Sequence, residues 1–173
     1  MDPLKPHEPA RVSGRLRNVV VVLLATTSIL SACSADPGGE SMKPSEAKKS
    51  IVDVVEHTTK SIGGDWNVYS GPAAESCDRP GAGSGARWSY IVERKALDGV
   101  DPAADVERVE QAWKDQGIAV ERFESGSADP LLGVRGSGGP VTSIGFNAFP
   151  QRYSVTGESV CFDGDVDDLR GAG

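Results

Sequence analysis

The last third of the chain contains four consecutive stretches in which apolar and polar residues alternate. A period of two places successive side chains on opposite faces of a β-strand, so each stretch has one face to bury. "SGGP" separates the second stretch from the third, and Gly138 and Gly139 can adopt the positive φ angles of a tight hairpin. We therefore predict strands at 118–123, 131–136, 142–149 and 152–162.

Two segments have the pattern of amphipathic helices. In residues 45–64, Ser45 is the expected N-cap, and Gly63 and Gly64 end the helix. One face of this helix carries Ala47, Ile51, Val54, Val55, Thr58 and Ile62. In residues 101–117, Asp101 is the expected cap and Pro102 suits the first helical position. The apolar stripe of this second helix consists of Val106, Val109 and Trp113.

Between the helices we expect a strand at 65–70, a loop at 71–86 and a second strand at 87–94. The order is thus helix, two strands, helix, four strands. This predicts an α+β fold, with a mostly antiparallel sheet of about five to six strands and two helices packed on one face. Residues 166–173 are expected to form a disordered acidic tail.

An uncharged, mostly apolar run at 19–30 follows three arginines, Arg11, Arg15 and Arg17. As a helix, these residues would rise about 18 Å, well short of the roughly 30 Å hydrocarbon core of a bilayer. A basic segment, a short apolar segment and small residues are typical of a secretory signal.

The run ends in "LSAC", residues Leu30, Ser31, Ala32 and Cys33. These four positions resemble the bacterial lipobox. The resemblance implies that Cys33 carries a diacylglyceryl group and that residues 1–32 are removed as a lipoprotein signal peptide. Two acyl chains anchor a protein stably, whereas one does so only marginally. The alternative is an ordinary signal peptide, with Cys33 as a small residue near its cleavage site.

On this interpretation residues 33–44 form the lipidated cysteine and a flexible tether, and residues 45–165 form a single globular domain. Two cysteines remain, Cys77 and Cys161, and export favours a disulfide between them over two free thiols. The chain has a net charge of −7 with no basic cluster, which argues against a nucleic-acid partner.

Motifs for catalysis or metal binding are nearly absent from the sequence. His57 is expected at the surface or at the flank of the first helix, and "GxSxG" does not occur. The glycine-rich "GAGSGA" lacks the residues of a phosphate loop, so we expect no cofactor. "DGDVDD" puts Asp163, Asp165 and Asp167 at calcium-loop spacing, but Asp168 replaces the required glycine. We expect no metal site there and a solvated acidic tail instead.

A carboxylate pair remains possible in such an acidic chain. Glu93, Glu121 and Glu158 lie on expected strands, and the sequence leaves open which way each one faces.

Aromatic residues are the other candidates for a binding role. Trp88 and Trp113 lie on apolar stripes and are expected in the core. Trp66 and Tyr69 are expected on opposite sides of one strand, so one of them should be exposed. An exposed aromatic beside "GAGSGA" would form a contact surface.

The lipobox, the Pro/Gly/Ser tether and the cysteine in "ESVCF" resemble the small, uncharacterised cell-envelope lipoproteins of high-GC Gram-positive bacteria and, more loosely, the LppA-like lipoproteins. The resemblance implies a domain lipid-anchored to the extracytoplasmic face of the cell membrane through Cys33. We expect a non-catalytic module that binds an envelope protein or a cell-wall component. The alternatives are a carboxylate-dependent cell-wall hydrolase and an accessory ligand-binding lipoprotein of a transporter.

Overall fold

The computed structural model describes residues 41–95, 99–127, 130–149 and 151–171. The described residues all belong to one compact unit. The expected signal peptide, Cys33 and most of the expected tether therefore lie outside the described residues. Among the helices that are described, none combines the length and the apolar composition that a membrane crossing requires.

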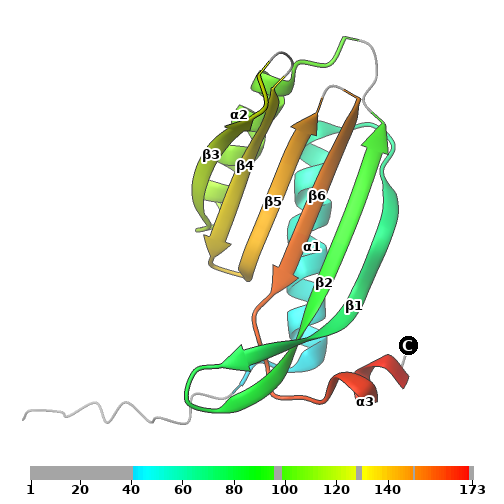
Figure 1. Cartoon of the computed structure of the whole chain (residues 1–173), viewed down its shortest axis with the longest axis vertical. Coiled ribbons are helices and arrows are strands. Elements are labelled where there is room, and N and C mark those ends of the chain that lie inside the picture. Colours follow the sequence, from blue (N-terminus) through cyan, green and yellow to red (C-terminus); the bar gives the residue numbers. More distant parts are fainter. Residues whose placement is uncertain (1–40, 96–98, 128–129, 150, 172–173) are drawn as a thin grey trace, which may run out of the picture. The chain divides into compact units, whose positions relative to one another are not determined.

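Three helices and six strands make up the described domain (Figure 1). In chain order they are α1 (Pro44–Ile62), β1 (Asn67–Arg79), β2 (Gly83–Lys95), α2 (Pro102–Lys114), β3 (Ala119–Ser125), β4 (Leu131–Gly138), β5 (Val141–Phe149), β6 (Arg152–Ser159) and α3 (Val166–Gly171). The strands form one sheet in the order β1-β2-β6-β5-β4-β3, and all neighbours are antiparallel. The predicted α+β class and the antiparallel sheet are confirmed.

Helices α1 and α2 cover the same face of the sheet (Figure 1). Helix α1 packs on β2 and β6, and α2 packs on β3, β4 and β5. Gly157 of β6 permits the close approach of α1, since a Cβ at this position would lie 2.4 Å from Ile51 Cδ1. Strand β6 therefore receives the apolar face of α1 directly.

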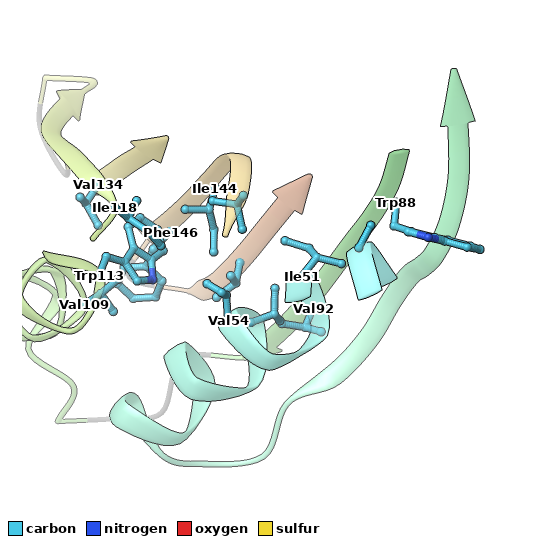
Figure 2. Close-up of a cluster of buried hydrophobic side chains, with 14 of the residues drawn as sticks. Ile51, Val54, Trp88, Val92, Val109, Trp113, Ile118, Val134, Ile144 and Phe146 are labelled. Atoms are coloured by element: carbon cyan, nitrogen blue, oxygen red, sulfur yellow. The ribbon is translucent and has the colours of Figure 1, made fainter. Parts of the chain in front are cut away.

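The core lies between this face and the two helices (Figure 2). From α1, all of the predicted face except the half-buried Ile62 is buried, and from α2 the whole predicted stripe is buried. Trp113 is fully buried and Trp88 is 7% exposed, which confirms both as core residues. Among the described residues, the buried core residues run from Ala47 to Phe162.

The structure corrects the expected loop at 71–86. Strand β1 continues through it to Arg79, and β2 already begins at Gly83. Gly71 and Pro72 are accommodated by a register shift between Ser70 and Ala73. Strand β1 is an edge strand, where a proline without an N–H is tolerated. Composition alone therefore suggested a loop where a long hairpin forms.

Two further expectations, at the first and last helices of the described domain, are wrong. The N-cap of α1 is Lys43 rather than Ser45, and Pro44 occupies the first turn, where its missing N–H costs nothing. In the expected disordered tail, residues 166–171 form α3. Val166 and Leu169 of α3 pack against the core. The expectation of disorder rested on the acidic residues and overlooked these two apolar ones.

Candidate functional site

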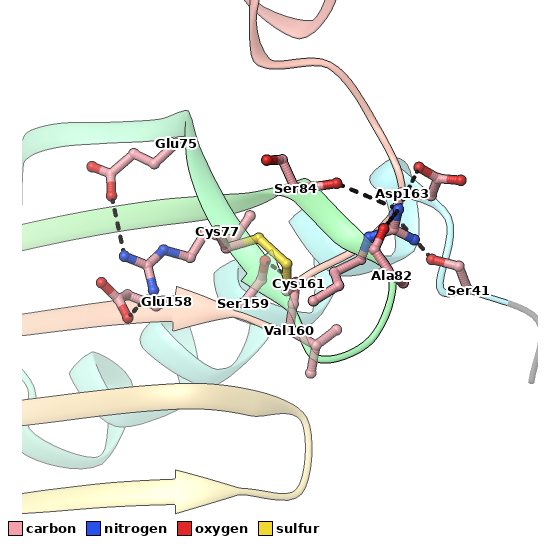
Figure 3. The surroundings of a disulfide bond; sticks show 12 residues. Ser41, Glu75, Cys77, Ala82, Ser84, Glu158, Ser159, Val160, Cys161 and Asp163 are labelled. Carbon is pink, nitrogen blue, oxygen red and sulfur yellow. Dashed lines mark hydrogen bonds and ion pairs between the residues drawn. A yellow bond between two sulfur atoms is a disulfide. The ribbon is translucent and has the colours of Figure 1, made fainter.

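The residues just before α1 lie beside the segment that follows β6 (Figure 3). The Asp163 backbone N–H, shortly after β6, donates a hydrogen bond to Ser41 Oγ at 3.0 Å, shortly before α1. Asp163 Oδ1 also accepts a hydrogen bond from Arg79 Nη2 at 3.0 Å. We call this part of the molecule, where Ser41, Arg79 and Asp163 meet, the entry end.

A disulfide closes the entry end. Cys77 in β1 is bonded to Cys161, just after β6, with their Cα atoms 6.1 Å apart (Figure 3). This separation lies within the usual range for disulfides, about 4.4–6.8 Å. The predicted pairing is confirmed, although Cys77 lies within a strand and not in the expected loop. The bond ties the chain after β6 to the projecting part of the β1–β2 hairpin.

Next to the disulfide, two backbone hydrogen bonds also join the segment after β6 to β2. The Phe162 N–H donates to Ala86 O at 2.8 Å, and the Ala86 N–H donates to Phe162 O at 3.0 Å. At Gly85 a Cβ would lie 2.4 Å from Phe162 O, so only glycine permits this approach. The chain after β6 is thus held against β2, and this positions α3 beside β1.

A cleft of about 440 Å³ opens at the entry end, between α1, β1, β2 and α3. Its lining includes Pro44, Lys48, Pro72, Trp88, Leu169 and Arg170. We call it the entry-end cleft. Lys48 and Arg170 are charged, and no carboxylate-bearing residue is among the described residues that line it. It is therefore a cationic hollow in a chain whose net charge is −7.

Trp88 forms the aromatic part of this lining. Its Nε1 donates to Pro44 O at 2.8 Å, and its backbone N–H donates to Ser159 Oγ at 2.9 Å. Lys48 Nζ lies 4.7 Å from the centroid of the ring, at cation–π distance. These contacts fix the ring between α1 and the sheet, so Trp88 serves the core and the cleft together.

Arg170, in α3, also lines the cleft. Its Nη2 donates to Ala74 O of β1 at 3.5 Å, and its Nη1 lies 3.6 Å from Asp167 Oδ1. The side chain is 64% exposed, so its ion pair with Asp167 is a weak surface contact. The guanidinium therefore keeps donors available to a ligand.

The sequence could not identify this cleft. Lys48, Trp88 and Arg170 belong to three separate elements, and none of them lies in a motif. Trp88 was predicted to be a core residue, and the positions of the two cations beside it depend on the packing of α1 and α3. Only an apolar period in the tail, Val166 and Leu169, could have suggested that α3 returns to the core.

The three strand carboxylates do not form a catalytic pair. Glu93 lies opposite Ser154 of β6, four residues from Glu158, a distance of about 13 Å along the strand. Glu121 is on β3, three strands from β6, or about 14 Å across the sheet. Glycosidase carboxylates are separated by about 5–9.5 Å. These residues therefore lack the spacing that the hydrolase alternative requires.

Two of these carboxylates take part in ion pairs instead. Arg87 Nη1 lies 3.0 Å from Glu158 Oε2, which also accepts a hydrogen bond from Ser143 Oγ at 2.9 Å. Arg152 Nη1 lies 3.1 Å from Glu93 Oε1. Both pairs link neighbouring strands, as cross-strand charge pairs commonly do.

The other candidate residues from the sequence do not line the entry-end cleft. His57 is exposed on α1. Within the described residues, no group of three or more His, Cys, Asp or Glu side chains is placed to hold a metal ion. In the acidic segment, the Asp167 N–H donates to Asp165 Oδ1, and Asp163 pairs with Arg79. Asp165 thus accepts a local hydrogen bond, whereas Asp163 forms a long-range ion pair with β1.

Of Trp66 and Tyr69, Tyr69 is the exposed one, at 69%, while Trp66 is half-buried. Tyr69 does not lie beside "GAGSGA". It is near the start of β1, and that glycine-rich segment forms the far end of the β1–β2 hairpin. The contact surface expected from the sequence is therefore not formed, because the strand continues for another ten residues.

Comparisons with known proteins identify no family for this chain. No family model matches it, and no curated protein matches it. Among solved structures, a DUF4853 family protein from Actinomyces odontolyticus ATCC 17982 is similar, with 20% identity over 72% of this chain and 67% of that chain, and a TM-score of 0.43. A likeness of this size carries no argument about function.

Proposed function

We propose that this protein is a lipoprotein anchored through Cys33 to the extracytoplasmic face of the cell membrane. Its domain binds an envelope protein or a cell-wall component and does not catalyse a reaction. The observation that supports export best is the Cys77–Cys161 disulfide, because disulfides persist outside the reducing cytosol. The lipobox at Leu30–Cys33 supplies the anchor.

The entry end supports a tethered arrangement. Only the residues from 34 to 40 separate Cys33 from Ser41, which is hydrogen-bonded to Asp163. A segment this short would restrict the domain to a shell close to the membrane, where it meets envelope partners at high effective concentration. A binding module benefits from this restriction without any catalytic group.

The lipid anchor is tested by metabolic labelling with a radioactive fatty acid. The wild-type chain should label and migrate as a processed form, whereas Cys33→Ala should not label and should accumulate as a precursor. Ser31→Ala is the matched control, since it keeps a small residue inside the lipobox and should label normally. Labelling of the Cys33→Ala variant would overturn the proposed anchor.

The two alternatives predict different behaviour. A hydrolase should release soluble fragments from cell wall, and the separation of Glu93, Glu121 and Glu158 argues against it. An accessory lipoprotein of a transporter should copurify with membrane transport proteins and bind a soluble nutrient. Crosslinking on intact cells, followed by identification of the joined partner, distinguishes the binding module from both.

A further inference from the structure

We propose that the entry-end cleft binds the anionic headgroup of a membrane phospholipid, so that the domain contacts the bilayer next to its own anchor. This inference rests on the proposed function, since it requires the domain to be tethered to a membrane. It assigns a ligand class to a cleft that α3 helps to line and that the disulfide helps to hold in place.

The charge of the cleft is the first argument. Lys48 and Arg170 line it, no other lining residue is charged, and the ion pair of Arg170 with Asp167 is long, at 3.6 Å, and exposed. A phosphodiester offers oxygen acceptors that an ammonium and a guanidinium can bind together through charge-assisted hydrogen bonds. The cleft is therefore complementary to a phosphate although the chain as a whole is acidic.

Lys48 also differs from other lysines on the two long helices. Lys49, Lys60 and Lys114 each pair with a carboxylate one turn away. Lys48 forms no ion pair within the part of the chain that the structure describes, and its ammonium lies over the Trp88 ring instead. Such a cation can bind an incoming anion without first breaking a salt bridge.

The apolar part of the lining suits the rest of a lipid. Trp88, Leu169 and Pro72 border the same cleft. Tryptophan is enriched at the boundary between headgroups and acyl chains, because its ring is apolar and its N–H is polar. Here the indole N–H is already bonded to Pro44 O, so the ring is what remains for contact with the glycerol backbone or the start of a chain.

The position of the cleft along the chain is the third argument. Pro44 lines it, and Cys33 precedes Pro44 by eleven residues. As the proposed tether, a segment of this length would span about 17–20 Å on average. The proposed diacylglyceryl group would therefore hold the cleft within reach of the headgroups. Even a weak contact is then populated, because the anchor raises the local lipid concentration.

The segment after β6 carries Asp163, Asp165, Asp167 and Asp168. Their negative charges oppose binding of the domain to an anionic surface. The attraction must therefore come from direct contact in the cleft and not from the general field of the domain. If direct contact is the source, lipid binding should depend on Lys48 and Arg170 and not on cations outside the cleft.

The test uses residues 34–173 without lipid, the mature chain of the proposed lipoprotein after Cys33, whose described part carries a buried apolar core. Short-chain dihexanoyl phosphatidylglycerol is titrated below its micelle concentration, with dihexanoyl phosphatidylcholine and inorganic phosphate as comparisons. Amide and indole proton–nitrogen NMR shifts report binding. We expect saturable shifts at Trp88 and Arg170 with phosphatidylglycerol, and at least tenfold weaker binding of the other two ligands.

Lys48→Glu and Arg170→Ala should each weaken phosphatidylglycerol binding about tenfold or more. Lys60→Glu is the matched control, because it makes the same charge change near the other end of α1 and should bind as the wild type does. Equal loss in Lys48→Glu and Lys60→Glu would overturn the proposal, as would no shifts with phosphatidylglycerol. Phosphate binding as tight as that of phosphatidylglycerol would also overturn it and indicate a small-anion site.

Failure of this proposal is distinguishable from failure of the proposed function. The NMR titration does not depend on Cys33, and the fatty-acid labelling does not depend on Lys48 or Arg170. Labelling without lipid binding in the cleft would leave the anchored binding module in place and remove only the headgroup contact.

Discussion

Trp113 Nε1 donates a hydrogen bond to Thr58 Oγ1 at 2.8 Å and so joins α2 to α1 inside the core. Both side chains are fully buried. The Thr58 hydroxyl in turn donates to Val54 O at 2.8 Å, so every polar atom of this small network is satisfied. A polar contact at the centre of an apolar layer fixes how the two helices lie against each other.

The first prediction follows from this network. Thr58→Val keeps the shape of the side chain but leaves the buried indole N–H of Trp113 without an acceptor, which should lower the free energy of unfolding by about 1–3 kcal/mol. Guanidinium unfolding monitored by tryptophan fluorescence measures the change. Thr59→Val, one position away on a half-buried part of α1, is the control and should have a much smaller effect. Equal stability of Thr58→Val and wild type would contradict the role of the bond.

The second prediction concerns the disulfide. Its sequence separation is 84 residues, and removing the bond should lower stability by about 4–5 kcal/mol on the chain-entropy account. The double variant Cys77→Ala/Cys161→Ala should therefore unfold at markedly lower denaturant concentration than the oxidised protein. Adding a reductant should destabilise the wild type and leave the double variant unchanged. In residues 34–173, which lack Cys33, two reactive thiols in the unfolded, non-reduced protein would contradict the pairing.

The spacing of apolar residues predicted much of this fold, because that spacing is a direct consequence of which side chains are buried. Alternation located β3 to β6, and helical spacing located the faces of α1 and α2, since in both cases the buried residues recur with the geometric period of the element. The pairing of Cys77 with Cys161 followed because no other cysteine remained once Cys33 was assigned to lipid.

Pattern failed where tertiary contacts override composition. Residues 71–86 are rich in glycine and proline, yet they form most of a hairpin, because β1 at the edge needs hydrogen bonds on one side only. The pairing of β6 with β2 could not be predicted, since it joins strands about sixty residues apart. The entry-end cleft was missed for the same reason, as α1, β2 and α3 each supply a single key residue.

The third prediction concerns Glu110 and acid pH. Glu110 accepts hydrogen bonds from Lys114 Nζ at 2.6 Å and from Arg122 Nε, and these bonds lower the pKa of its carboxyl. An unfolded glutamate titrates near about pH 4.3, so this stabilisation is present above that pH and is lost as pH falls through the lower folded pKa. Glu110→Gln should be less stable than wild type at pH 7, and the difference should close below about pH 4.

Denaturant unfolding at several pH values measures this difference. Glu107→Gln, at an exposed position of the same helix, is the control and should track the wild type. A gap between Glu110→Gln and wild type that stays constant from pH 7 to acid conditions would show that the lost contribution is not electrostatic.

The last prediction concerns Tyr153 at alkaline pH. Its ring is fully buried, and its hydroxyl donates to Asp105 Oδ2 at 2.9 Å. Burial and this hydrogen bond raise the pKa of the phenol well above its usual value. An unfolded tyrosine ionises near about pH 10, so the stabilisation is complete below that pH and declines as pH rises beyond it.

Tyr153→Phe removes the phenol and its hydrogen bond to Asp105, so the variant should be less stable than wild type at pH 8. Between about pH 9.5 and 11.5 the wild type should lose stability more steeply than the variant, and the two curves should converge. Guanidinium unfolding across this range measures both effects. Tyr69→Phe changes a side chain that is 69% exposed, and its curve should stay parallel to that of the wild type. Parallel curves for Tyr153→Phe and wild type would show that the buried phenol does not cause the loss of stability at alkaline pH.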